Sequence, residues 1–370
     1  MFGEYDDNHS LTFKAKNMNE LQTIPLTVIT GFLGSGKTTL LSSLLKKEEM
    51  KNVAVIINEF GEVGLDHALV ESSDENIVEL QNGCICCTIR GDLNKTLIDL
   101  FSKMSKGQIA RFNRVIIETT GLADPVPIIH TLMSSIDLLR IYVLDGVVTL
   151  VDATNGEDTL DLQKEAVKQA ALAELIIISK IDLVDEDKKN SLVTRLKTIN
   201  PSVKIMTSSF GDVPVSKLFG FSAYDPYNKS RDVKNWLAAE KLEEHHHHHH
   251  IDVNRHDENI EAFSMTSDQP VNTMAFGLFR DLLIAQMGPD LLRVKGIINI
   301  RDKDVPAVIH GVQHIFYPVQ WLDKWPDDDK RTKLVFITRN IKKEQIEGFF
   351  HALMGMIDEK GLPEELTELL

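Results

Sequence analysis

A glycine-rich segment near the N-terminus constrains the fold of this chain more than any other part of its sequence. Residues Gly31–Thr38 read Gly-Phe-Leu-Gly-Ser-Gly-Lys-Thr and match the pattern G-x-x-x-x-G-K-S/T at every fixed position. An apolar run at Leu26–Ile29 precedes the segment, and a helical pattern at Thr38–Lys46 follows it. A strand, a glycine loop and a helix N-terminus in this order form a phosphate-binding loop, or P-loop. The sequence therefore predicts a P-loop NTPase domain.

Short apolar runs and helical patterns alternate through the first half of the chain. Because most of these runs are continuously apolar, we expect strands buried on both faces of a mainly parallel sheet. Predicted strands lie at Val53–Asn58, Ile77–Leu80, Val115–Glu118, Val147–Asp152 and Leu175–Ser179, with helical patterns at Leu93–Met104 and Leu160–Leu172. We assign this α/β domain to residues 23–220 and read the polar residues 1–22 as a mobile leader.

The second half of the chain begins with a different composition. Residues 221–261 are rich in charged and turn-forming residues and contain the run His245–His250, which is typical of an exposed linker. Folded patterns resume in residues 262–370, where strands in succession are flanked by two helices, as in a smaller α+β domain. The predicted helices are Val271–Met287 and Lys343–Met354, and the strands are Leu292–Ile300, Ala307–Val312, Ile315–Val319 and Leu334–Thr338.

The charge balance excludes several classes of partner. With 40 Lys+Arg against 55 Asp+Glu the net charge is −15, which disfavours binding to the phosphate backbone of nucleic acids. No apolar run approaches the roughly 20 residues that span a bilayer, so we expect no membrane insertion. The N-terminus is acidic and lacks a signal sequence, and the only cysteines are three in one cluster; both features favour a cytoplasmic protein.

The P-loop supplies the first set of candidate site residues. Backbone N–H groups of the loop would surround the phosphates, Lys37 would neutralise the β- and γ-phosphates, and the Thr38 hydroxyl would bind Mg²⁺. Glu118 ends a predicted strand and would support the metal or the attacking water, while the Gly121 N–H would contact the γ-phosphate. The catalytic candidates are Lys37, Thr38 and Glu118, and the loop's binding candidates are Gly31, Gly34, Ser35, Gly36, Lys37, Thr38 and Thr39.

Residues Ser179–Asp182 follow a predicted strand and indicate which base the site takes. They are similar to the N/T-K-x-D guanine motif, in which a carboxylate accepts hydrogen bonds from guanine N1–H and the 2-amino group. Adenine lacks that pair of donors, so Asp182 would reject ATP. Lys180 would pack its stem along the base, and Ser179 stands where Asn is usual. The alternative is a helix N-cap after a strand; we expect GTP.

Three cysteines, Cys84, Cys86 and Cys87, lie within four residues and predict a metal site. Thiolates bind Zn²⁺ or Cu⁺ and also serve Co²⁺. Adjacent cysteines in an extended strand cannot all face one ion, so we expect a turn, which Gly83 would permit. An incomplete ligand shell would favour transfer over permanent binding. The alternative is a set of buried small apolar side chains.

Other residues could assist a metal. Glu59, in the loop Asn58–Glu62, could support the transition metal or Mg²⁺, or could belong to a solvated acidic loop. The run His245–His250 could collect metal at low affinity, although it is similar to a purification tag placed inside the chain. Isolated histidines are more often structural than metal-binding, and we read five in this way: His67, His130, His310, His314 and His351.

Taken together, these motifs resemble those of the CobW-type GTPases, relatives of the urease and hydrogenase nickel-insertion GTPases. The resemblance spans about residues 24–350 and rests on Gly31–Thr39, Asn58–Glu62, Gly83–Cys87, Glu118–Pro125, Ser179–Asp182, Leu292–Gly296 and the His-rich linker. It implies a slow GTPase that acts as a metallochaperone, with Mg²⁺ beside GTP and Zn²⁺ or Co²⁺ at the cysteines. It also implies a client metalloprotein or metal-insertion complex, and a C-terminal domain for partner contact or homo-oligomer formation.

Two other functions fit parts of the sequence. One is a non-catalytic zinc buffer or sensor, in which the nucleotide only regulates metal binding. The other is a P-loop kinase for a small acceptor, which the guanine motif at Asp182 disfavours. Because the cysteines lie between two segments expected at the γ-phosphate, metal affinity could depend on the nucleotide state.

Overall fold

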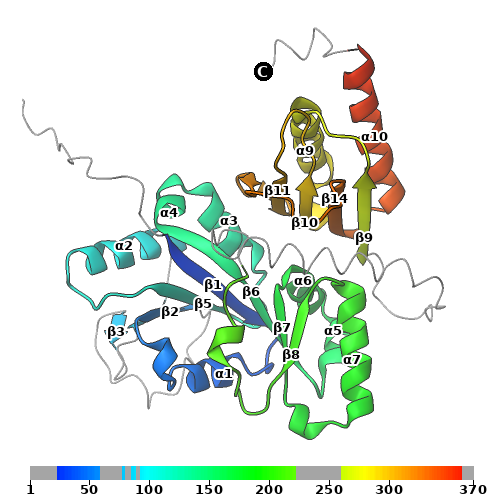
Figure 1. Ribbon diagram of the computed structural model, residues 1–370. Helices are drawn as coiled ribbons and strands as arrows, with labels where there is room; N and C mark the ends of the chain where they lie inside the picture. Colours follow the sequence, from blue (N-terminus) through cyan, green and yellow to red (C-terminus); the bar gives the residue numbers. More distant parts are fainter. Residues whose placement is uncertain (1–22, 59–76, 80–84, 89–91, 222–259, 361–370) are drawn as a thin grey trace, which may run out of the picture.

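The computed structural model describes residues 23–58, 77–79, 85–88, 92–221 and 260–360. These residues form two units, each built on its own β-sheet (Figure 1). The predicted leader, Glu59, Cys84 and the run His245–His250 lie outside the described residues. No helix in the described ranges is long and apolar enough to cross a membrane.

The first unit contains an eight-stranded sheet in the order β3-β4-β2-β5-β1-β6-β7-β8. Neighbouring strands pair in parallel except for β3, which runs antiparallel to β4. The strands are β1 Ile24–Gly31, β2 Val53–Asn58, β3 Ile77–Glu79, β4 Ile85–Thr88, β5 Arg114–Thr119, β6 Tyr142–Asp152, β7 Leu175–Ser179 and β8 Lys204–Thr207. The prediction of a mainly parallel α/β sheet is confirmed.

Helices cover both faces of this sheet, as its apolar strands require (Figure 1). The apolar side chains of α1 pack on one face together with residues 213–221, and those of α2, α3, α4, α6 and α7 pack on the other. The helices are α1 Lys37–Leu44, α2 Leu93–Ser105, α3 Val126–Ser134, α4 Ile136–Ile141, α5 Gly156–Leu162, α6 Lys164–Leu172 and α7 Glu186–Ile199, with short 3₁₀ turns η1 Glu48–Met50, η2 Ile181–Leu183 and η3 Val215–Lys217.

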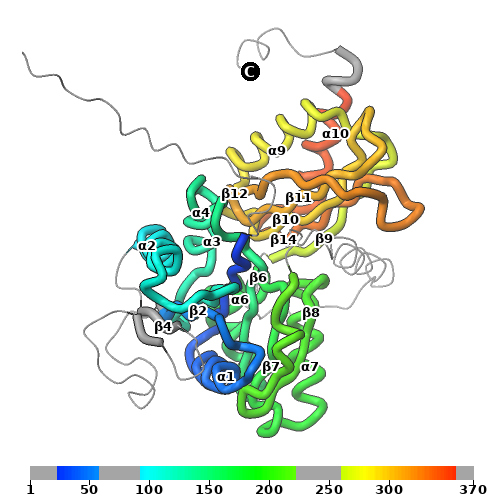
Figure 2. The backbone as a smooth tube through the Cα atoms, turned by 60° about the vertical axis from the view of Figure 1, so that its left-hand side comes forward, coloured from blue at the N-terminus to red at the C-terminus, as the bar shows by residue number. Residues whose placement is uncertain are grey.

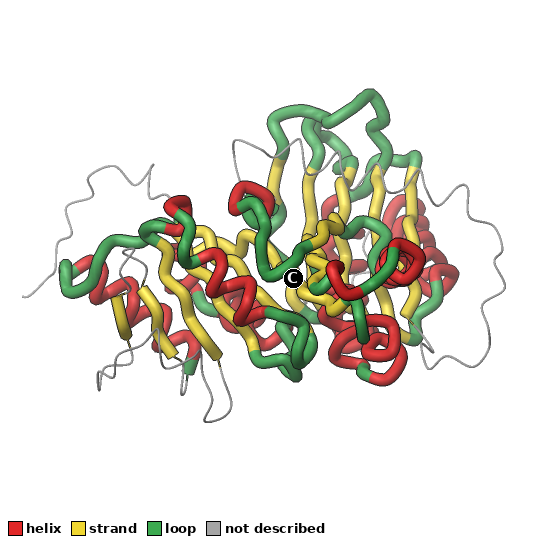
Figure 3. The backbone as a smooth tube through the Cα atoms, turned by 90° about the horizontal axis from the view of Figure 1, so that it is seen from below, coloured by secondary structure: helices red, strands yellow, loops and turns green. Residues whose placement is uncertain are grey.

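The second unit is an antiparallel sheet with two helices on one face (Figures 1 and 3). Its strands lie in the order β12-β11-β10-β14-β9, and β13 also pairs with β11. The elements are β9 Ile260–Ser267, α9 Thr273–Met287, η4 Gly288–Asp290, β10 Leu291–Ile298, β11 Ala307–Val312, β12 Ile315–Phe316, β13 Gln320–Trp321, β14 Thr332–Arg339 and α10 Lys343–Lys360. The predicted α+β composition is confirmed.

Several predicted elements differ from those observed. The predicted helix Leu160–Leu172 is wrong as a single element, because Gln163 has an extended backbone (φ −123°, ψ 107°) and separates α5 from α6. The predicted strand Ile315–Val319 ends at Phe316, shortly before Pro318; proline lacks the N–H that a ladder needs. Helix α9 starts two residues later than predicted, since the side chain of Asn272 caps its N-terminus.

The two units meet through apolar side chains and through one buried group of charges. Leu292 and Ile337 of the second unit join the core beside α6 and α7, and Val312 and Tyr317 join the core beside α3. Figure 2 shows the β11–β12 end of the second unit beside α3 and α4. The second unit is therefore packed against the first at two separate places.

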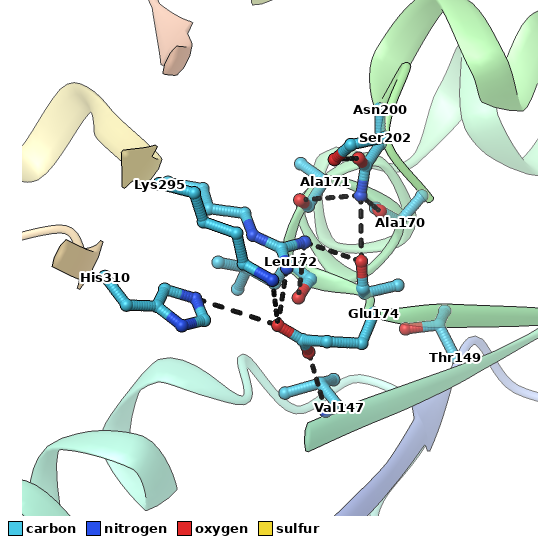
Figure 4. A network of polar contacts seen from close by, with 12 residues as sticks. Val147, Thr149, Ala170, Ala171, Leu172, Glu174, Asn200, Ser202, Lys295 and His310 are labelled. Carbon is cyan, nitrogen blue, oxygen red and sulfur yellow. Dashed lines mark hydrogen bonds and ion pairs between the residues drawn. The ribbon is translucent and has the colours of Figure 1, made fainter. Parts of the chain in front are cut away.

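The buried charges surround Glu174, which lies between α6 and β7 (Figure 4). Its Oε1 pairs with Arg293 and, at 3.3 Å, with Lys295 of β10, and its Oε2 accepts the Val147 N–H at 2.8 Å. Burial would raise the pKa of Glu174, but the charges of Arg293 and Lys295 outweigh it and hold the pKa below its usual value. The network therefore joins the two units through an ionised carboxylate.

Candidate functional site

The glycine loop between β1 and α1 adopts a conformation that needs its glycines. Gly34 and Gly36 have φ of 74° and 92°, in the left-handed region that favours glycine. At Gly31 (φ 142°) a Cβ would approach the Leu150 carbonyl oxygen to 2.4 Å, so only glycine fits there. The loop therefore turns tightly from the strand into the helix and directs the first N–H groups of α1 outward.

Lys37 is held inside this loop. Its side chain is buried, and its Nζ donates to the carbonyl oxygens of Gly31 at 2.9 Å and Phe32 at 3.3 Å. These contacts fix a positive charge within the curve of the loop. An ammonium at this position is suited to neutralise phosphate oxygens.

Thr38 and Glu118 meet although they are 80 residues apart. The Thr38 hydroxyl donates to Oε1 of Glu118 at 3.3 Å, and the Glu118 side chain is buried. Parallel pairing of β1 with β5, with Ile29 opposite Glu118, brings this carboxylate to the carboxyl edge of the sheet. A hydroxyl and a carboxylate are oxygen ligands of the kind that Mg²⁺ prefers.

Gly121 lies directly against the P-loop. A Cβ on Gly121 would come within 2.6 Å of the Leu33 nitrogen, so this close approach requires glycine. The side chain of Gln169 on α6 holds the segment by donating to the carbonyl oxygens of Gly121 at 3.3 Å and Ala123 at 2.9 Å. Gln169 was not predicted; it is a single buried amide with no motif around it.

A cavity of about 260 Å³ opens beside the loop at the ends of β7 and β8. Asp182 and Lys180 of the predicted guanine motif line it, together with residues that the sequence analysis did not identify. These are Ser208, Phe210 and Gly211, which follow β8, and Phe210 is 80% exposed. The predicted guanine motif therefore lies in a cavity with an unpredicted second wall and an aromatic ring at its rim.

The serine that stands in the usual asparagine position makes a hydrogen bond of its own. The Ser179 hydroxyl donates to the Ser35 carbonyl oxygen at 2.7 Å and so ties the guanine motif to the P-loop. Lys180 has φ 57°, and its Nζ pairs with Asp152 at 2.7 Å. Burial would raise the pKa of Asp152, but hydrogen bonds from Lys180, Thr154 and Asn155 outweigh this effect and lower it.

The cysteine segment lies partly in the sheet. Cys86 and Cys87 belong to β4, with Cys86 opposite Val55 and Cys87 opposite Ile56 of β2. The expectation that these two residues lie in a turn is therefore wrong, because β4 pairs with strands on both sides. In the described ranges no group of three or more His, Cys, Asp or Glu side chains is arranged to hold a metal. The complete ligand set stays a prediction.

Each of the two units matches a different protein-family model. Residues 25–207 match the model described as CobW/HypB/UreG, nucleotide-binding domain, and residues 260–354 match the cobalamin synthesis protein cobW C-terminal domain. The chain is also 33% identical over 336 residues to the zinc chaperone YjiA of Escherichia coli, covering 90% of this chain and 99% of that protein. This chain belongs to the CobW family. The predicted resemblance is confirmed.

Other CobW-family proteins extend the comparison. The zinc chaperone CobW of a Sinorhizobium species is 30% identical over 352 residues, covering 85% of this chain and 92% of that protein. A crystal structure of Zn(II)-bound YjiA GTPase from E. coli has 32% sequence identity and a TM-score of 0.71, covering 90% of this chain and 99% of that chain. The CobW-family fold thus extends over both units.

Proposed function

We propose that this chain is a GTP-hydrolysing metallochaperone that carries Zn²⁺, or Co²⁺, at its cysteines and delivers it to a client metalloprotein. The family membership supports this function, since similar proteins carry the names zinc chaperone and GTPase. In this proposal residues 23–220 form the GTPase domain, 221–261 the linker and 262–370 the C-terminal domain that contacts the client or a second copy. The protein would act in the cytoplasm.

The observation that supports the proposal is that Lys37, Thr38 and Glu118, the residues predicted to bind phosphate and Mg²⁺, lie together at one edge of a sheet. Lys37 would neutralise the β- and γ-phosphates, and N–H groups from Gly34 to Thr39 would surround them. Thr38 and Glu118 would hold Mg²⁺, which neutralises charge on the phosphates when bound. Glu118 is opposite Ile57, whose other neighbour is Thr88, next to Cys87.

The spacing of the strands provides a short physical path between the cysteines and the predicted phosphate site. Ile56 of β2 is paired with Cys87 on one side and with Ile117 of β5 on the other. The backbones at Cys87 and Ile117 are therefore two strand spacings apart, or about 10 Å. Gly121, which follows β5, lies against Leu33 of the P-loop. A rearrangement at the γ-phosphate would therefore reach the thiolates through the sheet itself, without a long chain of contacts.

Guanine selection in this proposal rests on Asp182. Its exposed carboxylate lines the cavity beside Lys180 and would accept from guanine N1–H and the 2-amino group. Phe210, at the rim, would cover the face of the base. Asp152 pairs with Lys180 and would hold its stem along the ring.

The decisive experiment measures Zn²⁺ affinity by competition with a chromogenic chelator, in the presence of GTP or GDP. We expect Cys86→Ala to lose at least about 100-fold in affinity, because thiolates supply most of a zinc site's binding free energy. Thr88→Ala, in the same strand, is the matched control and should keep wild-type affinity. Tight zinc binding by Cys86→Ala would disprove the metal assignment.

Nucleotide turnover separates a chaperone from a buffer. We expect slow GTP hydrolysis and an affinity for Zn²⁺ that differs at least about fivefold between GTP and GDP, as for a typical coupling free energy. GTP binding with no release of phosphate would instead support the zinc buffer or sensor. Equal zinc affinity in both nucleotides would rule out the coupling.

A further inference from the structure

Two histidines from different units lie side by side at the junction. The ring centroids of His130 on α3 and His314 on the β11–β12 turn are 5.3 Å apart, and the ring planes are inclined by 55°. Both side chains are exposed, so solvent and ions reach them. Their separation of 184 positions in the chain explains why the sequence presents them as two isolated histidines.

The positions of both histidines are set by buried neighbours. His130 follows Ile129 on α3, and the hairpin that carries His314 is flanked by Val312 and Tyr317, which are 4% and 5% exposed. Ile129, Val312 and Tyr317 belong to one apolar core that includes residues of both units. The contact between the rings therefore rests on a packed interface and not on two free side chains.

The turn itself is anchored from behind. Gln313 and His314 form a two-residue connection between paired Val312 and Ile315. Gln313 has φ 53°, its N–H donates to the Leu291 carbonyl oxygen at 2.8 Å, and its side-chain amide donates to Pro289 at 3.2 Å. A Cβ on Gly288 would lie 3.2 Å from the Cβ of His314, so glycine permits this close packing. The turn thus holds His314 in place against α3.

The separation of the rings suits a shared metal ion. A Zn–N bond of about 2.0–2.1 Å, plus roughly 1.1 Å from the ring nitrogen to its centroid, places each centroid about 3.2 Å from the metal. At a tetrahedral angle the two centroids would then be about 5.2 Å apart. The observed 5.3 Å agrees with this value.

We propose that His130 and His314 bind a divalent transition metal ion, Zn²⁺ above all, with one imidazole nitrogen each. Imidazole is a preferred ligand of such ions and a poor one for Mg²⁺. The described residues supply no third His, Cys, Asp or Glu ligand, so water or an incoming ligand completes the shell and the ion exchanges readily. The ion joins α3 of the GTPase unit to the second unit. This site is separate from the cysteines and does not depend on the proposed function.

The test uses carbethoxylation of histidines by diethyl pyrocarbonate, read residue by residue with peptide mass spectrometry on the full chain. At a free Zn²⁺ concentration about ten times the Kd, we expect modification of His130 and His314 to slow about tenfold together. His351, exposed on α10, is the internal control and should react equally with and without zinc at that concentration. Mg²⁺ should protect neither histidine of the pair.

Single variants show whether the two histidines share one ion. His130→Ala should remove the zinc protection of His314, and His314→Ala that of His130, whereas His351→Ala should change neither. Because both side chains are exposed, these variants are expected to fold, which circular dichroism checks. Protection of one histidine that survives loss of the other would overturn the shared site. Absence of protection below about 1 mM free Zn²⁺ would show that the two rings are in contact but do not bind a metal ion.

Discussion

The carboxyl edge of the first sheet and the junction between the units use charged groups in opposite ways. At the edge, Asp182 is exposed in a cavity and Thr38 is exposed beside Glu118. At the junction, Glu174 and Arg293 are 8% and 4% exposed and are paired with each other. The edge keeps Asp182 and Thr38 available to a ligand, whereas the junction pairs its buried charges with each other within the protein.

This difference predicts which property a substitution in each region changes. An available polar group contributes its free energy to binding, so its loss changes nucleotide affinity or turnover and leaves the fold intact. A buried pair contributes to folding, and removal of one partner leaves a charge without compensation. Substitutions in the two regions should therefore give opposite results for stability and for GTP chemistry.

The largest effect is expected for Lys37→Ala at the edge. Loss of the ammonium held at Gly31 should reduce GTP turnover by about 100- to 1000-fold, as for other preorganised charges at a phosphate or oxyanion. Circular dichroism should show a folded protein. Lys217→Ala, an exposed lysine on η3, is the control for loss of one positive charge. Turnover within threefold of wild type would remove Lys37 from the proposed site.

Asp182→Asn tests base selection at the same edge. The asparagine amide can donate to a carbonyl but no longer matches both donors of guanine, so GTP affinity should fall by about 100-fold. Xanthosine triphosphate, which carries a carbonyl in place of the 2-amino group, should bind better to the variant than to wild type. Fluorescent nucleotide titration measures both affinities. An unchanged preference for GTP would show that Asp182 does not contact the base.

At the junction, Arg293→Met should lower the stability of the fold. Glu174 would keep Lys295 but lose its closest partner, so the free energy of unfolding should fall by about 3 kcal/mol. Urea denaturation measures this loss, and Glu174→Gln added to the variant should recover part of it. Lys103→Met, in the exposed pair with Asp99, should cost less than about 0.5 kcal/mol. Equal losses in the two variants would contradict a buried network.

His310 predicts a pH dependence that arises at the junction. Burial and the charges of Lys295 and Arg293 hold the pKa of His310 well below its usual 6.5, although Glu174 lies 3.7 Å away. The unfolded chain binds a proton below about pH 6.5 while the folded chain does not, so stability falls as the pH drops through that range. His310→Phe keeps an aromatic ring against Tyr317. Between pH 6.5 and 5.5 this variant should lose about 1 kcal/mol less unfolding free energy than wild type. Parallel curves of unfolding free energy against pH would refute this.

The smallest effect is expected for Ser179→Ala, which removes the hydrogen bond to Ser35. A buried hydrogen bond contributes about 1 kcal/mol, so GTP affinity should weaken about fivefold. Ser202→Ala loses a partly buried hydrogen bond to Asn200, neither of which lines the cavity, and should leave the affinity unchanged. Identical GTP affinities in the two variants would show that the tie to the P-loop does not support binding.

The sequence predicted the parts of this protein that depend on local patterns. Continuous apolar runs predicted the parallel sheet, and the spacing of glycines and Lys37 predicted the loop, because backbone conformation there is decided within a few residues. The break at Gln163 was not predicted, because the residues on both sides have helical patterns and only packing separates α5 from α6. Strand β8 was not predicted either, since its four residues are partly buried or exposed and do not form an apolar run.

The sequence by itself determined the fold class, the family and the P-loop and guanine motifs. Tertiary structure alone decided the contact of Thr38 with Glu118, the hold of Gln169 on Gly121, the Glu174 network and the meeting of His130 with His314. The physical reason is the range of the interactions. Turns, caps and strand patterns act over a few neighbouring residues, whereas these contacts join residues tens to hundreds of positions apart, and only packing of the two sheets and their helices brings them together.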